Sequence, residues 1–127
     1  MPAVGLNHYN IRAGQPLIGR VRDFYVDVVG LHEGWRPPFD FPGYWLYAGE
    51  QAVVHLVETS AQQSTAAPPS VLDHVAFTCT EFEAFEAKLK SLGLDYRKSA
   101  APGTAIRQLF VKDPAGNGVE LNFSASP

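Results

Sequence analysis

Four side chains suited to bind a metal ion occur at positions that repeat along the chain: His8, His55, His74 and Glu120. His8 and His74 are 66 residues apart, and His55 and Glu120 are 65 residues apart. Each lies in a strand-like run of apolar residues, where an imidazole or a carboxylate is costly unless it is paired or bound. One such histidine is ordinarily a hydrogen-bonded core or surface side chain. Four groups at repeat-equivalent positions instead favour a ligand set for one divalent Zn, Ni, Co, Fe or Mn ion.

The residues around these four groups predict the same order of elements, β-α-β-β-β, in each half of the chain. Apolar alternation indicates the strands, a three- and four-residue apolar spacing indicates the helices, and Gly or Pro occurs at the breaks. In the first half the expected elements are strand 6–12, helix 17–29 ended by Gly30, short strand 33–36, and strands 43–48 and 52–58. In the second half they are strand 72–79, a helix from a Thr80/Glu83 capping box to Gly93, a short strand beginning at 94–97, and strands 105–111 and 119–123.

This repeat predicts an α+β fold of two tandem βαβββ modules, each a curved mixed sheet with its helix on the convex side. Module one spans about residues 5–58, module two about 71–124, and the small, polar, Pro-containing stretch 59–70 is interpreted as a linker. Neither half alone has enough residues for a secure core, so 1–127 is expected to be a single domain. A lone module would expose sheet edges, and pairing modules within one chain or between two removes that hazard.

Composition excludes several functional classes. A net charge of −3 and a pI near 5.7 provide no basic surface for nucleic acid. The chain has no apolar run of the roughly 20 residues needed to cross a bilayer, and its first residues lack the pattern of a signal peptide. The single cysteine, Cys79, suits a reducing compartment and is interpreted as a small buried hydrophobe. We therefore expect a cytoplasmic protein with neither a nucleic-acid nor a membrane partner.

Alternation along each strand predicts which way the four candidate ligands point. Val119, Leu121 and Phe123 share the face expected to meet the helix, which leaves Glu120 on the opposite, concave face. The same parity places His74 opposite to Val75 and Phe77, places His55 with Val53 and Val57, and places His8 with Asn10 and Arg12. The four groups are thus expected to converge inside concave surfaces.

Several segments resemble the glyoxalase I, bleomycin-resistance and extradiol-dioxygenase group, the vicinal oxygen chelate superfamily. The resemblance covers about residues 5–124, and its strongest segments are 6–8, 23–31, 54–56, 72–77 and above all 113–121 (DPAGNGVEL). It implies paired βαβββ units that enclose an open metal site, commonly at a dimer interface. His8, His55, His74 and Glu120 match the four metal-ligand positions of the glyoxalase I-like members, although glyoxalase I usually has glutamate at the position of His55. Arg12 matches an arginine that binds an anionic substrate group.

The activity implied by this resemblance is that of a metal-dependent lyase or isomerase of the glyoxalase type. The divalent ion would chelate neighbouring oxygens of a small substrate and stabilise an enediolate, with Glu120 as general base. The pocket walls are expected to include Trp45 and either Tyr47 or Tyr44. Strand 105–111 should add Phe110 or Arg107, which have opposite parity and remain alternatives.

Two other functions remain open, and a homodimer is expected for any of the three. An extradiol-type dioxygenase needs only two histidines and a glutamate, so the extra His55 argues against it. A non-catalytic small-molecule or antibiotic-binding protein of this group commonly lacks the metal ligands, so their presence argues against that function too.

Overall fold

The computed structural model describes residues 5–60 and 72–124. The chain divides into two compact units, Met1–Thr65 and Ala66–Pro127, each of which is described by itself. The linker predicted at 59–70 lies, from residue 61 on, outside the described residues.

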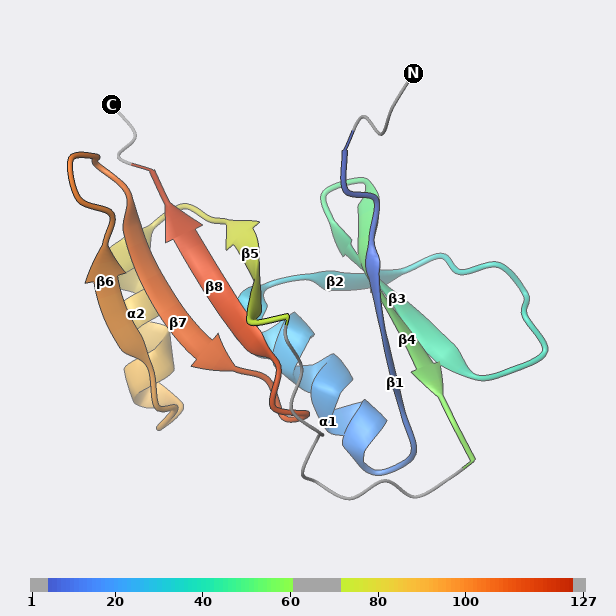
Figure 1. Ribbon diagram of the computed structural model, residues 1–127. Coiled ribbons are helices and arrows are strands. Elements are labelled where there is room, and N and C mark those ends of the chain that lie inside the picture. Colours follow the sequence, from blue (N-terminus) through green and yellow to red (C-terminus); the bar gives the residue numbers. More distant parts are fainter. Residues whose placement is uncertain (1–4, 61–71, 125–127) are drawn as a thin grey trace. The chain divides into compact units, whose positions relative to one another are not determined.

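Unit 1 is a four-stranded mixed sheet with a helix packed against it (Figure 1). The sheet order is β1-β4-β3-β2, in which β1 runs parallel to β4 and the other neighbours are antiparallel. Its elements are β1 (Tyr9–Ala13), α1 (Leu17–Phe24), a π-helical segment η1 (Tyr25–Val29), β2 (His32–Gly34), β3 (Gly43–Ala48) and β4 (Gln51–Glu58).

Unit 2 repeats this arrangement with the order β5-β8-β7-β6, and β5 runs parallel to β8. Its elements are β5 (His74–Thr78), α2 (Phe82–Ser91), β6 (Arg97–Ala100), β7 (Arg107–Lys112) and β8 (Gly118–Phe123). The predicted fold class, an α+β protein of two mixed sheets built from βαβββ units, is therefore confirmed.

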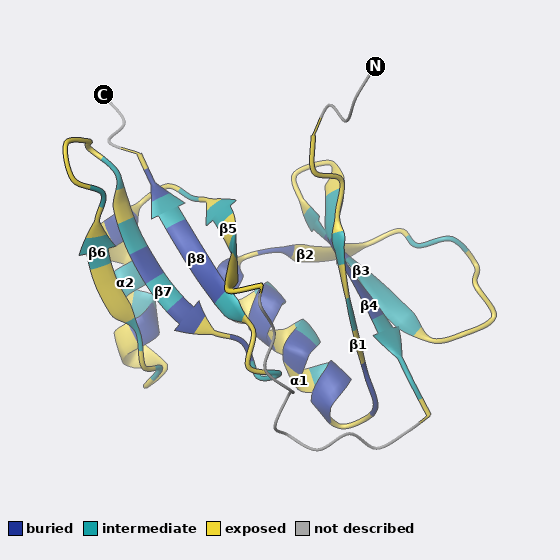
Figure 2. Ribbon diagram, in the orientation of Figure 1, coloured by how far each residue is buried: buried dark blue, intermediate teal, exposed yellow. Residues whose placement is uncertain are grey.

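The core of each unit consists of alternate strand residues and one helix face (Figure 2). In unit 1, Leu46, Val54 and Leu56 are fully buried, as are Ile18 and Val21 of α1. In unit 2 the buried set is Leu109, Val119, Leu121 and Phe123 with Phe82 and Leu89 of α2. The ring of Phe82 meets Phe123 edge-on at 5.2 Å. These apolar faces leave the other face of each sheet for polar groups.

Helix ends differ from the prediction in two places. The helix predicted at 17–29 changes to a π-helical turn at Tyr25, whose carbonyl accepts from the backbone N–H groups of both Gly30 and Leu31. Gly30 has φ +96°, so it ends the helix as predicted. The capping box at Thr80 and Glu83 is wrong: the N-cap residue is Glu81 at φ 68°, with no side-chain cap. Glu83 instead bonds Arg107, and the helix begins at the buried Phe82.

Strand boundaries shift by a few residues. β1 begins at Tyr9 and β5 at His74, later than predicted, so His8 precedes its strand and His74 opens its own. The short strand expected at 33–36 is found at His32–Gly34. β6 begins at Arg97 rather than 94 because the backbone N–H of Leu94 still bonds the carbonyl of Leu89, which prolongs the end of α2.

Replacing Gly118 with alanine is expected to lower the free energy of unfolding by about 1–3 kcal/mol, the usual cost of overpacking. A Cβ at this position would lie 2.4 Å from the carbonyl oxygen of Asp73, a backbone atom that cannot move without disturbing the β5–β8 pair. Gly5→Ala is the control because a Cβ there has nothing within 4 Å. Urea denaturation of both variants measures the difference, and equal midpoints would contradict the expected clash.

Candidate metal-binding side chains and their surroundings

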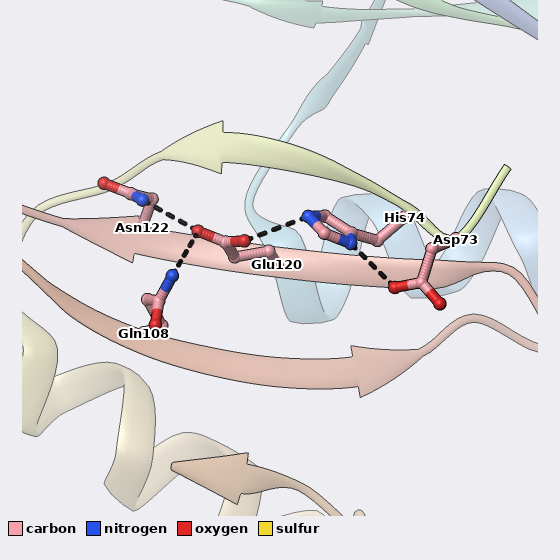
Figure 3. Close-up of polar contacts among 5 residues, drawn as sticks. All are labelled: Asp73, His74, Gln108, Glu120 and Asn122. Carbon is pink, nitrogen blue, oxygen red and sulfur yellow. Dashed lines mark hydrogen bonds and ion pairs between the residues drawn. The ribbon is translucent and has the colours of Figure 1, made fainter. Parts of the chain in front are cut away.

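His74 and Glu120 form a contacting pair on the open face of the unit 2 sheet (Figure 3). β5 and β8 are parallel neighbours, with His74 opposite Gly118 and Ala76 opposite Glu120. The pair is therefore diagonal across the two strands, and Nε2 of His74 lies 3.1 Å from Oε1 of Glu120. Glu120 is buried at 5% exposure. The alternation of β8 thus places this carboxylate opposite to Leu121, as predicted.

Three further side chains fix the orientation of this pair (Figure 3). Nδ1 of His74 lies 2.9 Å from Oδ2 of Asp73. The amides of Gln108 and Asn122 both donate to Oε2 of Glu120, at 3.3 and 2.7 Å. Oε2 is thus held by two neutral donors, while Oε1 faces the imidazole. The hydrogen bond from His74 holds the pKa of the exposed Asp73 carboxyl below its usual range.

The contacts of the two ring nitrogens of His74 fit a cation bound between His74 and Glu120. A neutral imidazole has one N–H, but both ring nitrogens of His74 face carboxylate oxygens. If Nδ1–H donates to Asp73, the lone pair of Nε2 points at Oε1 of Glu120. Two such atoms are favourable neighbours only when a proton or a metal ion lies between them. A nitrogen and an oxygen of this kind are the ligands that divalent transition metals prefer.

In unit 1, His8 and His55 stack face to face with ring centroids 3.7 Å apart. Trp45, opposite His55 on the neighbouring strand β3, stacks on the same imidazole at 4.0 Å. Both contacts are nearly parallel, at 13° and 12°, so the two rings cover opposite faces of His55. His55 is held rigidly and is 9% exposed.

The hydrogen bonds of these two histidines leave one nitrogen of each with a free lone pair. Nε2 of His55 lies 3.1 Å from the carbonyl oxygen of Ala52, which can only accept, so Nδ1 carries the lone pair. Nδ1 of His8 lies 2.7 Å from Oδ1 of Asn7, which leaves Nε2. Burial, and then the neighbouring His8, lower the pKa of His55. His55 is therefore neutral at neutral pH, the form that binds a metal ion.

Asn7 and Asp73 occupy equivalent places in the two units, and the sequence interpretation did not include them as functional residues. Each immediately precedes a candidate ligand and bonds Nδ1 of its imidazole. A carboxylate or carbonyl oxygen on the second nitrogen fixes the ring and makes the first nitrogen a better ligand. The recurrence of Asn-His and Asp-His 66 residues apart is the signal that could have revealed them.

Asp73→Ala is expected to weaken binding of Zn²⁺ or Ni²⁺ by about 10–100-fold, the usual effect of removing such an orienting group. Asp73→Asn should lose much less, because its amide oxygen can replace the carboxylate in the way that Asn7 serves His8. Competition with a chromophoric chelator measures both affinities. If alanine and asparagine variants bind as tightly as the parent, Asp73 has no orienting role.

The remaining predicted site residues are distributed between the two faces of each sheet. Arg12 is exposed on β1, opposite Val57 and two residues from Asn10, which pairs with His55. Tyr47 stacks on His32 at 5.7 Å, and its hydroxyl donates to the carbonyl oxygen of Trp35. Tyr44 instead lies beneath the guanidinium of Arg22 in α1, so it faces the helix.

Phe110 and Arg107, left as alternatives by the sequence, lie on opposite faces of β7. The ring of Phe110 meets His74 edge-on at 5.9 Å, on the face that carries Glu120. The guanidinium of Arg107 lies 4.0 Å above the ring of Phe82 and bonds Glu83, both in α2. The expectation that Arg107 lines the pocket is therefore wrong, because its charge and its planar face are satisfied by the helix.

The segment that joins β2 to β3 presents an exposed aromatic cluster, Trp35, Phe39 and Phe41. The guanidinium of Arg36 lies 4.9 and 5.1 Å from the two phenylalanine rings and donates to the carbonyl oxygen of Phe41. Trp35 and Phe39 each reach Trp45, which stacks on His55. A continuous series of rings thus leads from solvent to a candidate ligand, and no sequence expectation included it.

Cys79 is a half-buried free thiol whose sulfur lies 3.6 Å from the carbonyl oxygen of Phe77. Burial raises the pKa of this thiol above its usual range. Its thiolate fraction at pH 8 is therefore small, and iodoacetamide should alkylate it more slowly than it alkylates free cysteine, with a rate that still rises above pH 9. Mass spectrometry of timed samples measures both rates, and equal rates at pH 8 would contradict the effect of burial.

Within the described parts of the two units, no group of three or more candidate ligands lies together. Unit 1 brings His8 to His55, and unit 2 brings His74 to Glu120. No helix in the described residues is long and apolar enough to cross a membrane.

Two four-stranded mixed sheets, each built from a βαβββ unit, are the features of the glyoxalase-like α+β fold. The chain belongs to the Glyoxalase/Bleomycin resistance protein/Dioxygenase superfamily, whose family pattern it matches over residues 5–121. Members of this superfamily are often metal-dependent lyases or isomerases, and some are not catalytic.

The individual proteins to which this chain is similar have different described functions. The chain is 29% identical over 123 residues to Glyoxylase I 4 of Arabidopsis thaliana, covering 91% of this chain and 68% of that protein. Its fold is similar to that of a lactoylglutathione lyase from Agrobacterium tumefaciens (TM-score 0.68, 19% identity, 97% and 96% of the two chains). It is equally similar to TnmS3, an antibiotic-binding protein from Streptomyces sp. CB03234 (TM-score 0.70, 20% identity, 98% and 99% coverage).

Proposed function

We propose that this protein is a divalent-metal-dependent lyase or isomerase of the glyoxalase type, acting on a small oxygen-bearing substrate. His8, His55, His74 and Glu120 would hold one Zn, Ni, Co, Fe or Mn ion, within one chain or between two copies of a cytoplasmic homodimer. The observation that carries the proposal is the pairing of His74 with Glu120, in which Nε2 lies 3.1 Å from Oε1 while Nδ1 faces a second carboxylate, Asp73.

The bound ion would act as a Lewis acid that polarises a substrate carbonyl and stabilises the negative charge that develops on its oxygen. The protein's own contribution is orientation. Asp73 holds the imidazole of His74 through Nδ1, so this ring is fixed before any ligand binds and loses little orientational freedom on binding. His8 would have to turn out of its stack on His55 to share an ion with it, because the in-plane lone pairs of two parallel rings cannot meet at one point.

Glu120 is the group we propose as general base. Its Oε2 accepts from the amides of Gln108 and Asn122, which leaves Oε1 as the reactive oxygen. Oε1 would be displaced from the ion when substrate binds, and it would then take a proton from the substrate carbon and return it. Arg12 is proposed to bind an anionic substrate group, and Trp45, Tyr47 and Phe110 are proposed as pocket walls.

The test of this proposal is metal-dependent proton exchange. The chain, depleted with a chelator and reloaded with Ni, Co, Zn or Mn, is incubated in D₂O with a panel of 2-oxo and 2-hydroxy compounds, with and without glutathione. Deuterium incorporation next to a carbonyl, seen by NMR and lost again on chelation, is the expected result. Full metal loading without exchange or turnover on the whole panel would contradict catalysis.

The exposed aromatic cluster of Trp35, Phe39 and Phe41 favours a second candidate, a protein that binds a planar small molecule without transforming it. Such a cluster is an ordinary feature of ligand surfaces. Less than about one tenth of an equivalent of metal bound, with no gain on reloading, would support this candidate, because a catalytic site of the proposed kind needs its ion.

A further inference from the structure

Unit 2 contains a pocket of about 670 Å³ beside His74. Its lining includes Asp73, Arg97, Phe110, Lys112 and Gly118. Pockets of this size accommodate small organic ligands. His74 also lines the pocket, which lies at the end of the sheet where β5, β6 and β8 begin and β7 ends.

Arg97 forms no direct ion pair within the described residues, although its charge acts on Asp73, which lines the same pocket. It lies opposite Phe110 in the β6–β7 pair, and its guanidinium carbon is 4.2 Å from the centroid of that ring. Among residues 5–60 and 72–124, no side chain or carbonyl accepts a hydrogen bond from this guanidinium, whereas Arg22, Arg36 and Arg107 all donate one. One face of the group is covered by the ring, and its planar edge of N–H donors remains available.

Lys112 supplies a second positive charge near the same space. It lies opposite Gly118, which in turn lies opposite His74 in the next strand pair. Residues directly opposite one another in a sheet point to the same face, so the side chains of Lys112 and His74 share a face. Two carboxylates, Asp73 and Asp95, also line the pocket. The charges of Arg97 and Lys112 both act on the Asp73 carboxylate, whereas its direct hydrogen bond is with His74.

We propose that Arg97, with Lys112 nearby, binds an oxyanion of the substrate, a carboxylate or phosphate group, while the substrate's other oxygens are held at His74 and Glu120. A guanidinium stacked on an aromatic ring is preorganised for two parallel hydrogen bonds to such a group. The ring of Phe110 touches both Arg97 and His74, so a short-chain acid is long enough to reach both. The inference rests on the proposed function, and it names an anion-binding residue other than Arg12.

The chain provides a matched control for this proposal in the neighbouring Lys98. Lys98 follows Arg97 in β6 and points to the other face of the sheet, where its ammonium group lies 3.2 Å from Glu86 of α2. Lys98→Gln therefore removes one positive charge from the same strand without changing the pocket. Arg97→Gln removes the charge and the planar donors, and Arg97→Lys keeps the charge alone.

The experiment measures binding of succinate and of inorganic phosphate to the full ¹⁵N-labelled chain by NMR titration at constant ionic strength, metal-free and metal-loaded. We expect Arg97→Gln to weaken the better probe about tenfold, the loss typical of one charge-assisted hydrogen-bonding group. Arg97→Lys should also weaken it, whereas Lys98→Gln should leave the affinity unchanged. The probe that binds more tightly identifies the oxyanion as a carboxylate or a phosphate.

Metal content, measured separately on each variant, distinguishes the two levels of the proposal. The role of Arg97 is overturned if the Arg97→Gln variant holds as much metal as the parent and binds each probe as tightly as the parent does. It is also overturned if Lys98→Gln weakens binding as much as Arg97→Gln. If the parent holds no metal but binds the anion, and the Arg97→Gln variant does not bind it, the oxyanion site is supported and the proposed metal chemistry is contradicted.

Discussion

Replacing Glu120 with alanine is expected to reduce bound metal from about one equivalent per chain to less than about one tenth, because a four-ligand site of this kind tolerates no lost carboxylate. The substitution removes Oε1, which faces Nε2 of His74, and leaves the amides of Gln108 and Asn122 without their acceptor. His74→Ala should have the same effect, because it removes the nitrogen partner of this oxygen. Elemental analysis of purified, reloaded protein measures the stoichiometry.

Glu58→Ala is the matched control for this prediction. Glu58 is also a strand glutamate, but its carboxylate accepts a hydrogen bond from Gln15, and it has the opposite strand parity to His55. Its loss should leave the metal content unchanged. Unchanged metal in both the Glu120→Ala and His74→Ala variants would show that the ligand set is wrong.

The second large effect is on stability. Leu121→Ala is expected to lower the free energy of unfolding by about 2–5 kcal/mol, since it removes a fully buried side chain and leaves a cavity. A domain of this size has only about 5–15 kcal/mol in total, so the variant should unfold at much lower urea concentration. Leu121 lies between Val119 and Phe123 on the helix-facing side of β8, one residue from Glu120.

Leu92→Ala provides the comparison for this stability prediction, because Leu92 is 51% exposed at the end of α2. The same chemical change there should cost less than about 1 kcal/mol, as is usual at exposed positions away from special features. Chemical denaturation followed by circular dichroism gives both values. Equal losses in the two leucine variants would mean that the β8 face does not form the core of unit 2.

The parts of the fold that follow from periodicity were predictable from the sequence. Alternation in β8 separates Leu121 from Glu120, and this is enough to place the carboxylate on the open face. The two-fold repeat of strand and helix patterns likewise predicts the two mixed sheets. Both signals are local, since they depend only on the two-residue strand period and the helical period.

Other features depend on contacts that distant residues make. Parity alone shows that Phe110 and Arg107 face opposite ways. Only the packing of α2 shows that the guanidinium of Arg107 contacts Phe82 and Glu83. The same contact explains why the predicted capping box fails, since Glu83 is engaged elsewhere. The stacking of Trp45 on His55 depends on the β3–β4 register, which the sequence does not specify.

The most direct test of the central claim is a crystal structure of the metal-loaded protein with anomalous diffraction recorded at the absorption edge of the metal. We expect one strong peak per site, at about 2.0–2.2 Å from a nitrogen of His8, His55 and His74 and from an oxygen of Glu120. Those four ligands would come from one chain or from two copies. A peak bound by other residues, or a loaded protein in which these four side chains do not meet, would contradict it.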